Sequence, residues 1–288
     1  MRILDGKIVA KSIKDKVRED VAQLNASGKT VTLAVIQVGN NDASSTYVRN
    51  KEKACEECGI ESRIIRVVEE TSQDMLLAVI EMLNDDKTVD GILVQLPLPE
   101  HIDESAVIRA IAPEKDVDGF HPVNVGKHMI GEDTFVPCTA AGIIRLLDYY
   151  DIPIEGKDCV VVGRSNIVGK PVAMELLKRN GTVNICHSKT NWLPSYTRFA
   201  DILICAVGKP KFFDRTLVHD KTVVIDVGIH RQEDGSLCGD VDIESVQDMD
   251  ISITPVPGGV GPLTVAMLME NCVKAARGKR NEQGLQTL

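Results

Sequence analysis

The chain has 288 residues, a formal net charge of −9 and a pI near 5.2, and 43% of its residues are hydrophobic. Its length allows two domains with ordinary cores, and its composition is typical of a globular protein. The negative charge argues against general nucleic-acid binding, which needs a basic face. No apolar run approaches the length of a membrane span, and the N-terminus becomes charged too early for a signal peptide. We therefore expect a cytoplasmic protein without nucleic-acid or membrane partners.

The first part of the chain alternates between predicted helices and strands. Apolar residues at helical spacing predict helices over 7–27, 44–58 and 73–84. The apolar stripe of the first helix is expected at Ile8, Ile13, Val17, Val21 and Leu24. Short apolar runs predict buried strands at 32–39, 64–68 and 91–96. This alternation predicts a parallel sheet with helices on its faces.

Residues 97–138 interrupt this pattern with prolines and glycines, and only one clear helix is predicted there, near 104–111. An irregular stretch of this length has a function or joins two domains. Thr139 is the predicted N-cap of a helix that runs to about Tyr150.

A second alternating unit follows this stretch. Strands are predicted at 159–163, 183–186, 202–207 and 223–228, and a final helix over about 262–277. The sequence therefore predicts an α/β protein with two domains and a cleft between them. Ligands are expected at the carboxyl ends of the parallel strands.

Residues 157–179 combine a buried strand, a glycine-punctuated turn and a helix. Gly163 and Gly169 bracket the turn, which can bring backbone N–H groups and a helix N-terminus to a phosphate. Ser165 stands where the usual dinucleotide fingerprint has its second glycine. By itself, the segment does not distinguish a phosphate site from an ordinary strand–helix turn.

The next predicted strand favours NADP over NAD as the ligand of this turn. An NAD site has an acidic residue near the end of this strand, which binds the ribose 2′-OH. Here Ser188, Lys189 and Thr190 follow the strand, and Arg164 lies in the glycine turn. Cations and hydroxyls suit a 2′-phosphate. The alternative interpretation is that Arg164 and Lys189 are solvated loop charges.

The eight cysteines do not predict a metal site. Cys159, Cys186 and Cys205 fall in predicted buried strands, where a thiol acts as a small apolar side chain. Cys55 and Cys58 form a C-x-x-C on a predicted helix, but no second ligand pair has the spacing of a zinc site.

Several motifs occur in an order that is similar to one enzyme family. They are YVRNK (47–51), GILVQLPLPEHID (91–103), PEKDVDGFHPVN (113–124), PCTAAG (137–142), GRSNIVGKP (163–171), CHSKT (186–190), ADILICAVGKP (200–210), VIDVGIH (224–230), GDVD (239–242) and TPVPGGVGPLT (254–264). From its first helix to about residue 277, the chain resembles the bifunctional methylenetetrahydrofolate dehydrogenase/methenyltetrahydrofolate cyclohydrolase family. The segments DGILVQLPLP and PVPGGVGP are the most specific of these motifs.

The resemblance implies two successive reactions on a folate substrate. The first is the oxidation of 5,10-methylenetetrahydrofolate to the methenyl form by NADP⁺, and the second is hydrolysis of that product to 10-formyltetrahydrofolate. It also implies a folate-binding catalytic domain at 1–138, completed by a C-terminal helix at 263–288. A Rossmann-like NADP-binding domain is expected at 139–262, and the protein is expected to form a homodimer.

The resemblance assigns roles to four side chains. Tyr47 and Lys51 are four residues apart on a predicted helix and therefore share a face. By resemblance, Lys51 is the catalytic lysine, Tyr47 lies against the pterin ring, Gln95 tunes the lysine, and Asp118 binds the pterin N–H groups. We expect Lys51 to work at least partly uncharged, because the methenyl substrate is itself a cation. The alternatives are a solvated Tyr–Lys pair, a strand-end glutamine bonded to backbone and an ordinary turn aspartate.

Further contacts are implied by the same resemblance. The folate-binding residues are Tyr47, Gln95, Leu96, Pro97, Asp118, Pro257, Gly258 and Gly259. The cofactor-binding residues are Gly163, Arg164, Ser165, Ile167, Val168, Ser188, Lys189, Thr190, Gly208 and Ile229. Three other functions stay open: a dehydrogenase with little cyclohydrolase activity, a non-catalytic NADP-binding module, and an NADP dehydrogenase for another small substrate. The first leaves Lys51 and Gln95 unexplained, and the second makes no use of the four residues above.

Overall fold

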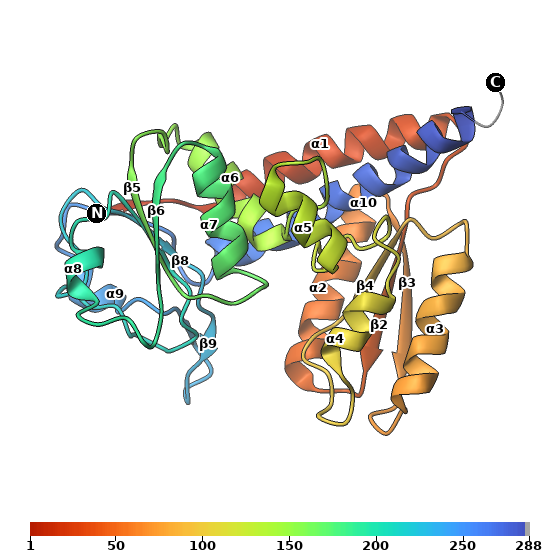
Figure 1. Cartoon of the computed structure of the whole chain (residues 1–288), viewed down its shortest axis with the longest axis horizontal. Helices are drawn as coiled ribbons and strands as arrows, with labels where there is room; N and C mark the ends of the chain where they lie inside the picture. Colours follow the sequence, from red (N-terminus) through yellow and green to blue (C-terminus); the bar gives the residue numbers. More distant parts are fainter. Residues whose placement is uncertain (286–288) are drawn as a thin grey trace. The chain divides into compact units, whose positions relative to one another are not determined.

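The computed structural model describes residues 1–285, except for the side chains of residues 42, 43 and 279–285. The chain forms two compact α/β units (Figure 1). The six-stranded unit consists of residues 1–10 and 137–264, and the three-stranded unit consists of residues 11–136 and those from 265 onward. Each unit contains a parallel sheet, so the predicted two-domain α/β fold is confirmed.

The sheet of the three-stranded unit has the order β3-β2-β4. Its strands are β2 (Thr32–Val38), β3 (Glu61–Val67) and β4 (Gly91–Val94). The helices are α2 (Asp42–Cys58), α3 (Gln73–Asp85), α4 (Glu104–Ala110) and α5 (Pro122–Ile130), and α1 (Gly6–Ala26) and α10 (Val260–Leu285) each contribute to both units. Every residue of the central strand β2 is buried, as its unbroken apolar run predicts.

Two details of this unit differ from the prediction. Ile8 does not belong to the apolar stripe of α1: its side chain is 51% exposed, whereas Val9 is 2% exposed and lies four residues before Ile13. The stretch 97–138 contains a second helix, α5, so the prediction of a single helix there was wrong. Pro122 begins α5 at its first turn, where a proline is well tolerated, and Gly131 ends it with φ 81°.

The sheet of the six-stranded unit has the order β1-β11-β8-β7-β5-β6, and all of its neighbouring strands are parallel. These strands are β1 (Arg2–Ile3), β11 (Ser252–Ile253), β8 (Val223–Asp226), β7 (Ile202–Cys205), β5 (Asp158–Val162) and β6 (Thr182–Cys186). The helices are α6 (Cys138–Tyr149), α7 (Gly169–Lys178), α8 (Pro194–Thr197) and α9 (Ile243–Val246), and β9 (His230–Arg231) pairs antiparallel with β10 (Leu237–Cys238).

The predicted N-cap of α6 is wrong. The helix begins at Cys138, the preceding residue is Pro137, and no side chain caps it. The Thr139 hydroxyl lies 3.1 Å from the Thr264 hydroxyl instead. A threonine near a helix start can also hydrogen-bond to a distant side chain, as Thr139 does here.

The thiols of the predicted buried strands are buried. Burial raises the pKa of Cys159 to about 11, and on α2 it raises the pKa of Cys55 to about 12 and that of Cys58 to about 11. Within the described residues, no group of three or more His, Cys, Asp or Glu side chains could hold a metal ion. The same part of the chain has no helix that is both long and apolar enough to cross a membrane.

Candidate functional site

The structure brings Lys51 and Gln95 together in the three-stranded unit. Lys51 lies on α2, Gln95 directly follows β4, and Lys51 Nζ donates to Gln95 Oε1 at 3.0 Å. Gln95 is buried, and its Nε2 donates to the Leu96 carbonyl at 2.6 Å. Because this second bond holds the amide plane, the amide oxygen faces the lysine. The glutamine therefore bonds both to backbone and to Lys51.

Tyr47 lies one helical turn before Lys51 on α2, and its side chain is 44% exposed. The phenol ring thus offers an accessible flat surface beside a half-buried ammonium group. Such a surface can stack on a planar heterocycle.

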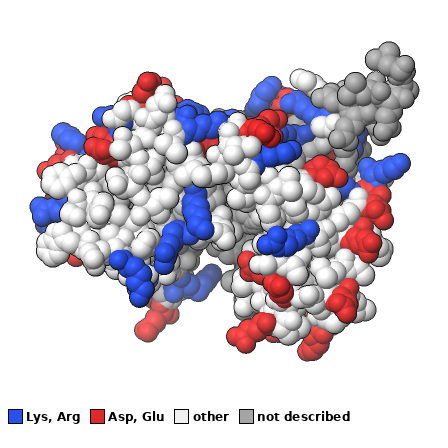
Figure 2. Space-filling model, viewed as in Figure 1, with Lys and Arg blue, Asp and Glu red and all other residues white. Residues whose placement is uncertain are grey.

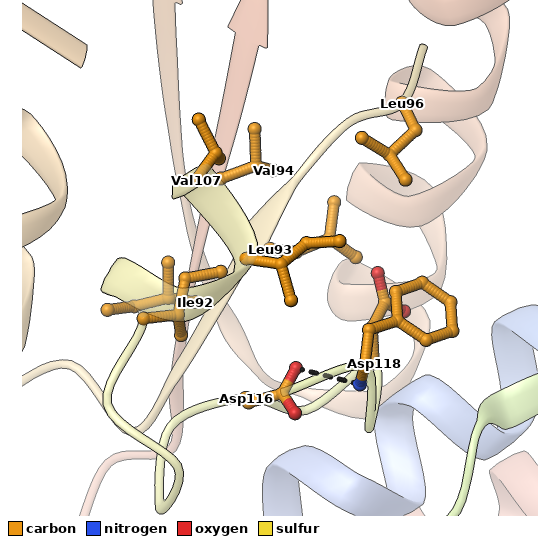
Figure 3. Close-up of a pocket in the computed structure, with 10 residues that line it drawn as sticks. Ile92, Leu93, Val94, Leu96, Val107, Asp116 and Asp118 are labelled. Atoms are coloured by element: carbon orange, nitrogen blue, oxygen red, sulfur yellow. Dashed lines mark hydrogen bonds between the residues drawn. The ribbon is translucent and has the colours of Figure 1, made fainter. Parts of the chain in front are cut away.

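Asp118 lines a small pocket next to this strand end (Figure 3). The other lining residues come from β4, the segment after it, α4 and the loop after α4, and are Ile92, Leu93, Val94, Leu96, Val107, Ile108, Ile111, Asp116 and Phe120. Burial raises the pKa of Asp118, the positive charge of Lys51 opposes this effect, and the negative charge of Asp116 adds to it. The pocket therefore combines an apolar wall with two carboxyl groups, of which Asp118 is influenced by the positive charge of Lys51.

Two neighbouring charged residues hold the loop that carries Asp118. Asp116 is buried and accepts hydrogen bonds from Phe120 N at 3.2 Å, His121 N at 2.7 Å and Asn124 Nδ2 at 2.8 Å. Lys115 is buried too, and its Nζ donates to three carbonyls at the end of α3, at 2.6–2.8 Å. The sequence pattern predicts no role for Lys115. Its partners are backbone carbonyls, which no sequence pattern identifies.

The glycine turn of the six-stranded unit joins β5 to α7. A Cβ atom at Gly169 would lie 2.2 Å from the Gly163 carbonyl oxygen, so the turn requires glycine there. Ser165 Oγ accepts from Val168 N at 3.1 Å and from Gly169 N at 3.3 Å. The serine at the second glycine position therefore closes the turn itself.

The two turns that carry the predicted cations lie at the ends of neighbouring strands. Val162 at the end of β5 pairs with Cys186 at the end of β6. Arg164 lies two residues after Val162, and Ser188 lies two residues after Cys186, so both follow the same edge of the sheet. Thr190 Oγ1 accepts from His187 N at 2.8 Å and Lys189 N donates to His187 Nδ1 at 3.2 Å, which makes a tight turn. Arg164, Ser188 and Lys189 are exposed. Figure 2 shows several Lys and Arg side chains gathered over the part of this unit near β9.

The remaining predicted residues lie in loops of the same unit. Gly208 follows β7 with φ 66°, and Ile229 follows β8 and is exposed. The predicted folate residues Pro257, Gly258 and Gly259 also belong to this unit, where Gly6 N donates to the Gly258 carbonyl at 3.0 Å. Tyr47, Lys51, Gln95, Leu96, Pro97 and Asp118 belong to the three-stranded unit.

Comparison with known proteins identifies the family of the chain. The catalytic-domain model of tetrahydrofolate dehydrogenase/cyclohydrolase matches residues 4–118, and the NAD(P)-binding-domain model of the same family matches residues 137–280. A relative from Agathobacter rectalis, named bifunctional protein FolD, is 58% identical over 275 residues, which are 96% of this chain and 99% of the relative. The protein of the same name from Campylobacter fetus is 54% identical over 280 residues, 97% of this chain and 99% of the relative.

Solved structures agree with these matches. The bifunctional enzyme FolD from Campylobacter jejuni superposes with a TM-score of 0.95 at 50% identity, covering 97% of this chain and 99% of its own. A FolD from Trypanosoma brucei, solved with NADP and an inhibitor, gives a TM-score of 0.90 at 37% identity, covering 96% and 97% of the two chains. The chain belongs to the tetrahydrofolate dehydrogenase/cyclohydrolase family.

Proposed function

We propose that the chain oxidises 5,10-methylenetetrahydrofolate with NADP⁺ and hydrolyses the methenyl product to 10-formyltetrahydrofolate. The hydrogen-bonded pair of Lys51 and Gln95 carries this proposal, because hydrolysis needs a group that moves protons near the reacting carbon. The names of relatives that are 52–58% identical, and the NADP in the Trypanosoma brucei structure, support the same pair of activities.

The cofactor-binding role falls to the six-stranded unit. The exposed Arg164 and Lys189 and the hydroxyl of Ser188 fit the charge and hydrogen-bonding needs of a ribose 2′-phosphate. NADP⁺ supplies the hydride acceptor when it is bound. The hydride step itself needs little acid–base help from the chain, because the nitrogen lone pairs beside the one-carbon bridge stabilise the developing cation. Gly163, Ser165, Ile167, Val168, Thr190, Gly208 and Ile229 complete the proposed cofactor site.

Hydrolysis of the methenyl group is assigned to Lys51. Water attacks the bridge carbon, and an uncharged Nζ takes the proton that this oxygen loses. The bond from the bridge carbon to N5 then breaks as N5 takes the proton from Nζ. The hydroxyl group on the bridge carbon loses its remaining proton to solvent as its C=O bond forms, which leaves the formyl group on N10. The Gln95 amide accepts a hydrogen bond from Nζ and so directs the lone pair of the amine away from itself.

The three-stranded unit provides the proposed folate contacts. Tyr47 stacks against the pterin. Asp118 accepts hydrogen bonds from the paired N–H donors of the pterin ring. These donors replace the water molecules that a half-buried carboxylate lacks. Leu96 and Pro97 lie beside Gln95 in the chain and add apolar contacts. Pro257, Gly258 and Gly259 would approach the ligand through their backbone. The proposed folate-binding domain consists of residues 1–138 with 263–288, and the proposed NADP-binding domain consists of residues 139–262.

A homodimer is proposed through the edge of the six-stranded sheet. Strand β6 ends the sheet, and the following segment exposes 77% of Trp192 and 74% of Phe199. An open strand edge beside exposed aromatic rings favours association. Sedimentation of the wild type and of Phe199→Glu tests this surface. We expect the wild type to be a dimer and the variant to be a monomer. If both proteins sediment as monomers, the proposed homodimer is rejected.

The decisive experiment for the two activities uses Lys51→Met with Lys53→Met as the matched control. Lys53 is exposed on the same helix. We expect Lys51→Met to slow methenyl hydrolysis at least about 100-fold while it retains oxidation of the methylene substrate, and Lys53→Met to retain both. Equal loss of both activities in Lys51→Met would reject the assignment. Wild-type oxidation without accelerated hydrolysis would leave only a dehydrogenase.

A further inference from the structure

Two buried carboxylates connect the loops that follow β7 and β8 in the six-stranded unit. The side chain of Asp240 is 0% exposed and that of Asp226 is 4% exposed. Neither residue has a role in the proposed chemistry above. Buried carboxylates are rare unless they bind a cation or accept several hydrogen bonds, so their partners show what they do.

Asp240 binds three successive backbone amides of the loop after β7. Its Oδ2 accepts from Val207 N at 2.6 Å and from Gly208 N at 3.0 Å, and its Oδ1 accepts from Lys209 N at 3.0 Å. The same Oδ1 lies 2.8 Å from His230 Nε2, in β9. Successive amides that point at one anion form the kind of backbone nest that binds phosphate in nucleotide sites. Here the protein's own carboxylate fills that nest.

Asp226 holds Asp240 in place. Asp226 Oδ1 accepts from Asp240 N at 2.9 Å and from Gly228 N at 3.0 Å, and Oδ2 accepts from Val241 N at 2.9 Å. A Cβ atom at Gly239 would lie 1.8 Å from Asp226 Oδ2, so the GDVD segment needs its glycine. Asp226 at the end of β8 thus fixes the backbone around residue 240.

The loop that Asp240 holds lies at the point where the strand order of the sheet reverses. Strand β5 has β6 on one side and β7 on the other, so the loops after β5 and β7 diverge there. Dinucleotides bind at this point in open α/β sheets. The two loops are in close contact, because a Cβ atom at Gly163 would lie 2.2 Å from the Ala206 carbonyl oxygen. Any shift of residues 206–209 would therefore move the glycine turn or its ligand.

We propose that Asp240 is a positioning residue for the cofactor, which sets the backbone of Val207, Gly208 and Lys209 and keeps phosphate out of their amide nest. The proposal rests on the proposed NADP-binding function of this unit. Since the nest already holds a carboxylate, Gly208 meets an uncharged part of the cofactor, and the phosphates are left to the turns after β5 and β6. His230 supports the same carboxylate from β9.

The test compares Asp240→Asn with Asp248→Asn in the full chain. An asparagine has one acceptor oxygen where the carboxylate has two, so it cannot accept from all of Val207, Gly208 and Lys209 in the observed geometry. Asp248 is an exposed carboxylate of the same unit that pairs with Arg215, so its variant controls for loss of charge. Titration calorimetry measures NADP⁺ binding, and absorbance follows both reactions, with hydrolysis assayed in the absence of NADP⁺.

We expect Asp240→Asn to raise the Kd and the KM for NADP⁺ at least about tenfold while methenyl hydrolysis stays within about twofold of wild type, and Asp248→Asn to match wild type. An NADP⁺ affinity within twofold of wild type would overturn the proposal. So would an equal loss of both activities, which would indicate general damage to the fold. Wild-type turnover is measured in parallel, and its absence would reject the proposed function rather than the role of Asp240.

Hydrogen exchange on the wild type keeps the proposal testable if Asp240→Asn does not fold. Without NADP⁺, the amides of Val207, Gly208 and Lys209 should exchange slowly, because a buried carboxylate already binds them. Exchange of these amides at the rate of an unstructured loop would show that the nest is not filled and would overturn the proposal.

Discussion

The buried carboxylate of Asp226 gives a prediction for how the stability of the chain depends on pH. Burial raises the pKa of Asp226 from 3.8 to about 6, and the nearby charge of Asp240 acts in the same direction. The backbone hydrogen bonds from Val241, Asp240 and Gly228 oppose this rise but do not outweigh it. We therefore expect Asp226→Asn to remove one pH-dependent contribution to the unfolding free energy.

The sign and size of this contribution follow from proton linkage. Between pH 3.8 and about 6, the folded chain holds the proton of Asp226 more tightly than the unfolded chain does. The contribution to stability is complete below pH 3.8 and is lost as the pH rises through about 6. At about 1.4 kcal/mol per pH unit, it amounts to about 3 kcal/mol.

Urea unfolding at several pH values between about 4.5 and 8 measures this contribution. The unfolding free energy of wild type minus that of Asp226→Asn should increase as the pH falls. Asp240 and the Cys205 thiol lie near this carboxylate, and His230 contacts Asp240; all three are present in both proteins. The control Asp248→Asn should show almost no change over this range, because Arg215 lowers the pKa of the exposed Asp248 from 3.8 and its titration falls below the range. A difference between wild type and Asp226→Asn that is constant, or that falls with decreasing pH, would refute the reasoning.

Three further substitutions test the sites. Arg164→Ala should reduce the preference for NADP⁺ over NAD⁺ about 10- to 100-fold, the equivalent of one charged hydrogen bond, and an unchanged ratio of kcat/KM values would make Arg164 a solvated loop charge. Asp118→Asn should raise the folate KM about tenfold or more at unchanged KM for NADP⁺, and an unchanged folate KM would reject its pterin contact. Lys115→Met should lower the unfolding free energy by about 3 kcal/mol, because three carbonyls at the end of α3 lose a charged donor, and a loss below about 1 kcal/mol in urea unfolding would contradict this.

The regular elements could be predicted because their signals are local. The apolar run of β2 is buried on both faces, and the glycine at 163 follows a buried strand as expected. Helix α5 was missed because Pro122 looks like a loop residue in the sequence, whereas its fixed φ and missing N–H suit the first turn of a helix. β1 was missed as well, because two residues give no periodicity, and only their pairing with β11 makes them a strand.

The sequence suggests candidate residues for the site but not the contacts that hold them in place. Lys51 and Gln95 are 44 positions apart in the sequence. Their contact depends on how α2 packs beside the end of β4, which is a property of the fold and not of the local sequence. Lys115, Asp226 and Asp240 work through backbone amides and carbonyls instead. Any residue supplies those backbone groups, so no pattern of side chains identifies such contacts in advance.

The neighbours Asp116 and Asp118 show why position in a motif does not determine the role of a residue. In an extended segment, residues two apart face the same side, so the two carboxylates of KDVDGF would be equivalent. The structure separates them by a turn, in which Gly119 N donates to the Asp116 carbonyl at 3.1 Å and Gly119 has φ 75°. Both side chains line the pocket, but Asp116 accepts hydrogen bonds from amides of its own loop, whereas Asp118 experiences the charge of Lys51. Gly119 thus allows one carboxylate to support the loop while the next one lies near the charge of Lys51.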